Sequence, residues 1–155
     1  MPIPDFVRDL RRSVGQVELW LPGVTAVVVR DRELLLVRRA DNGEWSPVTG
    51  IVDPGEEPGV AARREVLEET GVEVSVDRLA WVQALPTITH VNGDVATYLD
   101  HTFACSYLGG EAHVADDESL EVGWAPLSDL PPMSRSFLDR IECVLENDPV
   151  TRFTS

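Results

Sequence analysis

Glu65, Glu68 and Glu69 are the residues whose types and spacing first suggest chemistry. In a helix these three carboxylates share one narrow arc, because successive residues are 100° apart. Like charges at such spacings repel by about 0.2–0.5 kcal/mol a pair, although Arg64 can neutralise Glu68 at i,i+4. A bound cation would offset the repulsion, and carboxylate oxygens suit Mg²⁺ or Mn²⁺. The other interpretation is a solvated acidic face, which is the usual fate of a charge run.

The elements that must position these acids begin with their own helix. Pro58 suits the first helical turn and Gly71 suits the residue just past the last turn, so the sequence predicts a short helix between them. Val60, Val66 and Leu67 fall roughly opposite the glutamates. We expect these three side chains to anchor the helix to a core.

The whole stretch GIVDPGEEPGVAARREVLEETGV, residues 50–72, resembles the Nudix box, G-x5-E-x7-R-E-U-x-E-E-x-G-U with U aliphatic. Val66 and Val72 fill aliphatic positions. All fixed positions are matched, by Gly50, Glu56, Arg64, Glu65, Glu68, Glu69 and Gly71. Seven such matches arise by chance roughly once in 10⁸ starting positions.

The resemblance extends more loosely over residues 24–131. Trp45 and Pro47 precede the box as a tryptophan-x-x-proline type of segment often does in the family. One departure is Thr49, because the family often has a second glycine before Gly50. This change could alter how closely the backbone approaches a metal or a phosphate.

The resemblance implies an α/β fold, the Nudix α/β/α sandwich with a mixed β-sheet. We expect a single domain over residues 1–155, because a chain of this length forms one core. An N-terminal helix within residues 1–16 and a frayed tail at 147–155 lie outside the resemblance.

Roles for the box residues also follow from the resemblance. It implies that Glu65, Glu68 and Glu69 are metal ligands together with the backbone carbonyl of Gly50. Arg64 would orient a ligand carboxylate, a supporting contact that tunes such sites. Glu56 and Gly71 complete the motif, and we expect structural roles for both, with Glu56 tying the loop to the helix.

A further acidic residue on a later loop often serves family members as an extra ligand or general base. The candidate stretch here is Ala115-Asp116-Asp117-Glu118. We select Glu118, with Asp117 second, so the expected catalytic set is Glu65, Glu69, Glu118 and Arg64, and Glu118 joins the expected metal ligands. The alternative is a solvated acidic turn, since loops are rich in such residues.

Arg38 and Arg39 close the apolar run Glu33–Val37 and point to opposite sides of a strand. Arginine binds phosphate well because its guanidinium can donate two parallel hydrogen bonds. We therefore expect one of the two to bind substrate. The alternative is a pair of exposed charges at a strand end.

These residues together predict a Mg²⁺- or Mn²⁺-dependent pyrophosphohydrolase. The resemblance implies that its substrate is a nucleoside diphosphate derivative, either a nucleoside triphosphate or a nucleotide sugar such as ADP-ribose. The alternative is a non-catalytic Nudix-fold module that binds nucleotide and regulates. Family members are often homodimers, and the N-terminal helix could serve that purpose.

Charge excludes other partners. The net charge of −14 disfavours a nucleic acid polymer or an anionic membrane surface. No segment resembles a signal peptide or a membrane span, and Cys105 and Cys143 lack metal-ligand spacing. We expect both to be free thiols, buried or partly buried, and the protein to be cytoplasmic.

The remaining pattern predicts many short strands and three helices. Residues 5–14 read as a helix capped by Asp5 and stopped by Gly15, and a closing helix begins near Ser134. Asn92-Gly93 is the strongest hairpin signal, and Asp31-Arg32 is a second. The predicted strands are 17–21, ending at Pro22-Gly23, then 24–29, 33–37, 73–76, 79–85, 87–91, 95–108, 111–114 and 120–125.

Overall fold

The protein is described from a computed structural model covering residues 3–155, so the first two positions of the expected N-terminal segment 1–16 lie outside the described residues. Its elements in chain order are α1 (Asp5–Val14), β1 (Leu19–Arg30), β2 (Glu33–Arg39), β3 (Trp45–Ser46), β4 (Val48–Ile51), α2 (Pro58–Thr70), β5 (Glu73–Ala84), β6 (Ile88–Thr89), β7 (Val95–Gly109), β8 (Ser119–Pro126) and α3 (Arg135–Leu145).

The eight strands of the described residues form one mixed sheet. Five of them lie side by side in the order β3-β2-β1-β7-β5. The long central strands β1 and β7 run parallel, and every other pairing is antiparallel. The remaining strands β4, β6 and β8 pair with β1, β7 and β2 respectively. The predicted mixed sheet is therefore confirmed.

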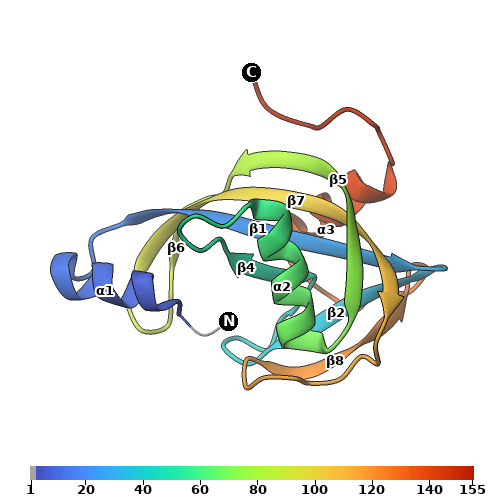
Figure 1. The fold of residues 1–155 in the computed structure, drawn as a ribbon, viewed down its shortest axis with the longest axis horizontal. Coiled ribbons are helices and arrows are strands. Elements are labelled where there is room, and N and C mark those ends of the chain that lie inside the picture. Colours follow the sequence, from blue (N-terminus) through green and yellow to red (C-terminus); the bar gives the residue numbers. More distant parts are fainter. Residues whose placement is uncertain (1–2) are drawn as a thin grey trace.

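The two faces of the sheet are covered by different helices. One apolar cluster contains Val24 and Val28 of β1 with Ala62 of α2, and the other contains Val27 of β1 with Ile141 of α3. The alternation along β1 follows from the period of two in a strand. Figure 1 shows α2 across the near side of the strands. The α/β/α arrangement predicted from the sequence is thus confirmed.

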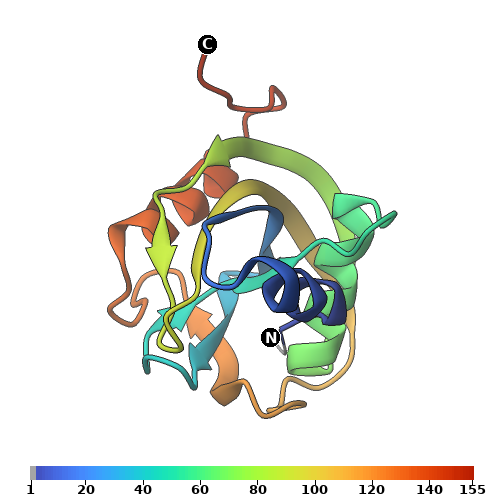
Figure 2. The same ribbon diagram turned by 90° about the vertical axis from the view of Figure 1, so that its left-hand side faces the viewer.

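A third, smaller cluster joins α1 to one end of the sheet through Val7, Leu21, Ile51 and Ala96. Figure 2 shows α1 in front of this end. Val7 is the buried residue of α1, whereas Leu10 and Val14 are exposed to solvent. The helix begins after Pro4, so Asp5 lies in its first turn rather than at the cap.

Several predicted strand limits were wrong for identifiable reasons. β1 continues through Pro22. Its register with β4 starts only at Gly23, so the N–H that proline lacks is not needed as a hydrogen-bond donor between these two strands. The predicted strands 73–76 and 79–85 form the single strand β5, which contains bulges. Only two residues of the predicted strand 87–91 are paired, as β6. The strands β3 and β4 were not predicted.

Both hairpin turns were predicted correctly. Asp31 takes a positive φ of 54° between the paired residues Arg30 and Glu33. Gly93 has φ 86°, and the N–H of His90 donates to the carbonyl of Asp94 at 2.8 Å. A side chain at position 93 would be strained by this φ, which explains the glycine.

The C-terminal segment 147–155, expected to be a frayed tail, contacts β5 through Arg152. Arg152 pairs with β5, donating from its N–H to the carbonyl of Ala80 at 2.8 Å and accepting from the N–H of Val82 at 3.1 Å. Its guanidinium lies over the ring of Trp81, 5.0 Å from the centroid.

Cys105 and Cys143 are both buried free thiols, as expected. In the part of the chain that the structure describes, no helix is long and apolar enough to cross a membrane.

Candidate active site

The acid-bearing helix α2 begins at Pro58 and ends at Thr70, with Gly71 in the left-handed conformation at φ 70°, so both predicted limits are confirmed. A side chain at Gly71 would also clash with the ring of His113. The acids lie on an arc that turns partly inward. Glu65 and Glu69 are 3% and 5% exposed, whereas about half of the Glu68 side chain is exposed.

The predicted anchoring face of α2 was largely wrong. Val66 is buried, but Val60 and Leu67 are 58% and 49% exposed. Ala61 and Ala62, both fully buried, make the contact with the sheet instead. Their small side chains let the helix lie close to the strands, and this closeness brings the neighbouring glutamate side chains under cover.

Gly50 on β4 makes room for Glu65. A Cβ atom at position 50 would overlap the carboxylate group of Glu65, so a residue with any side chain would displace that acid. The departure from the family at Thr49 does not affect this contact, because successive strand residues face opposite ways. Thr49 instead lines a cavity on the other side of β4.

Arg64 connects the acids to the preceding loop. Its Nε and Nη2 donate to the two carboxylate oxygens of Glu56, each at 2.9 Å, and its Nη1 donates to Glu65 at 2.9 Å and Glu68 at 3.1 Å. Glu56 also accepts from the N–H of Asp53 at 3.1 Å. The hydrogen bonds that Arg64 donates to Glu56 lower the pKa of Glu56 and raise the pKa of Arg64.

Nearby positive charge does not offset the cost of burying the ionised carboxylates of Glu65 and Glu69. Burial raises the pKa of Glu65 to about 7, even though Arg64 opposes the shift. Burial also raises the pKa of Glu69 to about 8, with added repulsion from Glu65 and Asp116 and partial relief from Arg39. The ionised forms of both acids therefore require additional positive charge nearby.

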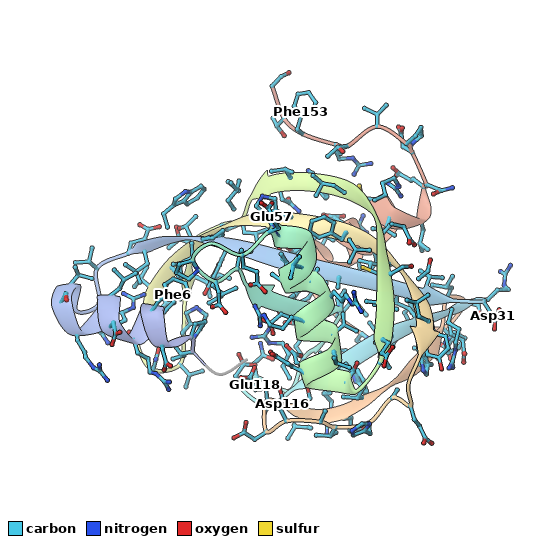
Figure 3. All side chains as sticks on the ribbon, viewed as in Figure 1. Phe6, Asp31, Glu57, Asp116, Glu118 and Phe153 are labelled. Carbon is cyan, nitrogen blue, oxygen red and sulfur yellow. The ribbon has the colours of Figure 1, made fainter. Side chains whose placement is uncertain are left out.

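The segment that leads to the acidic residues 116–118 lies against the end of α2 and does not form the predicted strand. Residues 111–114 form no strand, because the segment pairs with the helix end. The N–H groups of His113 and Ala115 donate to the last carbonyls of α2, those of Thr70 at 3.0 Å and Glu69 at 3.2 Å. Figure 3 shows Asp116 and Glu118 beside the end of α2 that is distant from Glu57.

Arg38 and Arg39 point to opposite sides of β2, as predicted. Arg38 pairs with Glu121 on the adjacent strand β8 at 2.7 Å. Arg39 donates to both carboxylate oxygens of Asp41, at 3.0 and 2.7 Å, and to the hydroxyl of Thr49 at 3.4 Å. Burial alone lowers the pKa of Arg39, but the hydrogen bonds with Asp41 raise it overall.

A cavity of about 490 Å³, within the size range of small-molecule sites, lies beside the acid-bearing helix. Its lining includes Arg39, Glu69, Asp117 and Glu118, contributed by three separate parts of the chain. Arg38, Glu65 and Glu68 are not among its lining residues. The participation of Asp41 and Thr49 was not anticipated, because only the fold reveals which neighbours hold Arg39.

The donor set fits a divalent cation bound with help from a ligand. The available groups are carboxylate oxygens, which Mg²⁺ and Mn²⁺ prefer, and the two buried acids need positive charge. Within residues 3–155, however, no three His, Cys, Asp or Glu side chains are gathered as a metal cage.

The chain belongs to the Nudix family. A family model described as the NUDIX domain matches residues 20–143. The chain is 41% identical over 102 residues to a MutT-like protein of Streptomyces ambofaciens, covering 65% of this chain and 60% of that protein. It is 34% identical over 124 residues to an NAD-capped RNA hydrolase NudC of Chromobacterium violaceum, covering 77% of this chain. This chain spans only 44% of that second relative's length.

Solved structures agree with the family assignment. A MutT NUDIX hydrolase from Burkholderia pseudomallei is 29% identical with a TM-score of 0.68, over 81% of this chain and 98% of that one. A NUDIX hydrolase from Nitrosomonas europaea, 24% identical, has a TM-score of 0.72 over 86% of this chain and 93% of that one. The second likeness concerns the fold alone.

Proposed function

We propose that the protein is a divalent-cation-dependent pyrophosphohydrolase that cleaves the diphosphate linkage of a small nucleoside diphosphate derivative. The observation that carries this proposal is the meeting of Arg39, Glu69 and Glu118 in one cavity, beside a helix whose acids are buried without enough countercharge. The names of the relatives, which include an NAD-capped RNA hydrolase, support hydrolysis. A nucleoside triphosphate and a nucleotide sugar both remain candidates.

The proposed roles divide between cation binding and substrate positioning. Glu65, Glu68 and Glu69 hold the cation together with the backbone carbonyl of Gly50. A bound Mg²⁺ or Mn²⁺ supplies a lowered pKa for the attacking water and offsets charge on the phosphate oxygens. Arg64 keeps Glu65 and Glu68 in place through the hydrogen bonds that also hold the loop at Glu56.

The reaction needs a base and a phosphate anchor. Glu118 accepts a proton from a water molecule, the water oxygen bonds to one phosphorus, and the bridging P–O bond breaks so that the second phosphate leaves with the bridging oxygen. Arg39 binds a phosphate oxygen at the same side of the cavity. Its guanidinium is fixed in advance by Asp41 and Thr49, so little side-chain freedom is lost on binding.

The proposal is tested with a panel of nucleoside triphosphates, dinucleotides and nucleotide sugars, incubated with Mg²⁺ or Mn²⁺ and assayed for phosphate, pyrophosphate or nucleoside monophosphate. We expect at least one substrate to turn over, and Glu69→Gln to reduce kcat/KM about a thousandfold, the scale of losing one charge-stabilising group. Glu73→Gln is the matched control, because Glu73 is exposed and begins the next strand. An inactive wild type, or a Glu69→Gln variant of normal rate, would favour a binding module instead.

A further inference from the structure

We infer that α1 and the hairpin leading into β7 form the nucleobase subsite of the cavity, so that a segment outside the family domain selects the base. The inference rests on the proposed function, since it names the part of the cavity that binds the base rather than the phosphates. The cavity-lining residues assigned to this subsite are Ile3, Val7, Arg11, His90, Asp94 and Tyr98.

The floor of this subsite is apolar and is assembled from four elements. Val7 of α1, Leu21 of β1, Ile51 of β4 and Ala96 of β7 are all buried in one cluster, and all of them line the cavity. Tyr98 packs against the same cluster. An apolar floor beside an aromatic side chain suits a planar heterocycle, whose faces are poorly hydrated.

The charges on this side disfavour a phosphate. Arg11 donates through Nη1 to the backbone carbonyl of Val17 at 2.5 Å and through Nη2 to that of Val95 at 2.6 Å, so two of its three nitrogens hold α1 to the neighbouring segments. Among the described residues its Nε has no hydrogen-bond partner, and it lies 3.6 Å from a carboxylate oxygen of Asp94, which offsets the charge of Arg11. A phosphate here would face the Asp94 carboxylate beside an arginine whose charge is already offset. An uncharged base has no such penalty, and its polar edge can meet side chains at the rim.

The rim offers polar groups in fixed positions. His90 Nε2 and the Tyr98 hydroxyl lie 3.0 Å apart, with the two rings perpendicular. The side-chain amide of Asn92 donates to Asp94 at 2.9 Å, and Gln16 donates to the carbonyl of Asn92 at 3.2 Å. These contacts fix the hairpin against α1. The subsite is thus held in shape before a ligand arrives.

α1 lies outside the part of the chain that the family model matches. The family match covers residues 20–143, whereas α1 spans Asp5–Val14. Figure 1 shows α1 at one end of the molecule, away from α2. The phosphate side of the cavity is therefore built from residues within the matched domain, while the base side depends on a segment that the family model does not match.

The nucleoside titrations of this test measure binding without metal and without turnover. Adenosine, guanosine, cytidine and uridine are titrated into the chelator-treated protein and followed by NMR, and magnesium pyrophosphate is titrated separately as a probe of the phosphate side. We expect at least one nucleoside to bind and to shift α1 and hairpin signals. Val7→Trp should fill the subsite and weaken nucleoside binding at least tenfold, while pyrophosphate binding changes by less than about twofold.

Val14→Trp is the matched control, because Val14 is the same residue type on the same helix, is exposed, and does not line the cavity. It should alter neither titration. Tyr98→Ala is a second variant in case Val7→Trp fails to fold, which thermal unfolding will reveal, and it should also weaken nucleoside binding at least tenfold. Equal effects of the two valine variants, or nucleoside shifts confined to other regions, would overturn the inference.

The outcome is separable from that of the proposed function. If nucleosides bind at α1 but no nucleotide is hydrolysed, the proposed function fails and the base subsite stands. If nucleotides are hydrolysed but Val7→Trp leaves KM for every substrate unchanged, the base subsite is wrong and hydrolysis stands. In the expected case, Val7→Trp raises KM at least tenfold with little change in kcat.

Discussion

Two groups of charged side chains are buried within residues 3–155, and their surroundings differ. One lies between the sheet and α3, where Arg140 and Asp100 are 4% and 2% exposed. Arg140 donates to Thr25 at 2.7 Å and approaches Asp100 to 3.7 Å, and Thr25 and Thr102 each donate to Asp100 at 2.8 Å. Each charge here has an opposite charge and hydrogen bonds.

The other group is the pair of buried acids on α2. Glu65 shares Arg64 with Glu56 and Glu68, and the charge of Arg39 relieves Glu69 only in part. Both pKa values are raised by burial, to about 7 and about 8. Burial lowers the pKa of Arg140 as well, but Asp100 opposes that shift directly. The contrast supports the proposed function, in which the α2 acids would bind a cation, whereas the α3 network holds the fold together.

Among the variants that test this difference, Arg140→Met is expected to have the largest effect on the free energy of unfolding. Removing one partner of a buried pair leaves Asp100 without its countercharge, so the free energy of unfolding in urea should fall by about 3–5 kcal/mol. Turnover per folded molecule should stay within about twofold, because Arg140 does not line the cavity.

Arg135→Met is the matched control for that loss, since Arg135 lies on the same helix with an exposed side chain paired to Asp139 and Glu142. Exposed pairs contribute little, so its free energy of unfolding should change by less than about 1 kcal/mol. A comparable loss in both variants would mean that the buried network has no special structural role.

A smaller effect, on turnover alone, is expected from Glu118→Gln. If Glu118 is the base, kcat should fall by at least about a hundredfold with a nearly unchanged free energy of unfolding. Asp117→Asn, one residue away and also lining the cavity, should cost much less. Near-normal kcat in Glu118→Gln, measured with the preferred substrate from the panel, would remove this residue from the proposed site.

The sequence predicted the parts of the site that depend on neighbours along the chain. The limits of α2, the shared arc of its glutamates and the opposite directions of Arg38 and Arg39 all follow from local geometry, and all were confirmed. The Asn92-Gly93 turn belongs to the same category, because its backbone conformation is encoded by the dipeptide itself.

What the sequence could not supply depends on pairing between distant segments. The burial of α2 through Ala61 and Ala62 rather than Leu67 depends on how closely the helix meets the sheet. Residues 111–114 were predicted as a strand, yet the N–H groups of His113 and Ala115 bond to the end of α2. The sequence alone also gave no sign that α1 lines the cavity.

The smallest expected effect is a gain in the free energy of unfolding of Glu69→Gln. This variant tests whether the buried acids of α2 lower the stability of the fold. In the unfolded chain Glu69 ionises near its ordinary pKa of 4.5, whereas in the folded chain its pKa is about 8. The folded state therefore binds more protons between these values, and the contribution of Glu69 to stability declines as pH rises through this window. Glu69→Gln lacks this decline.

In chelator, the Gln variant should gain on the wild type by about 1 kcal/mol between pH 5 and pH 8, a discounted share of the 1.36 kcal/mol per pKa unit. Urea unfolding at several pH values measures the gain, and Glu73→Gln controls for the loss of one exposed charge. Added Mg²⁺ with pyrophosphate should stabilise the wild type more than the variant at pH 8. A Glu69→Gln variant that loses stability at pH 8 as Arg140→Met does would show that this acid, too, is held by the fold for structural reasons.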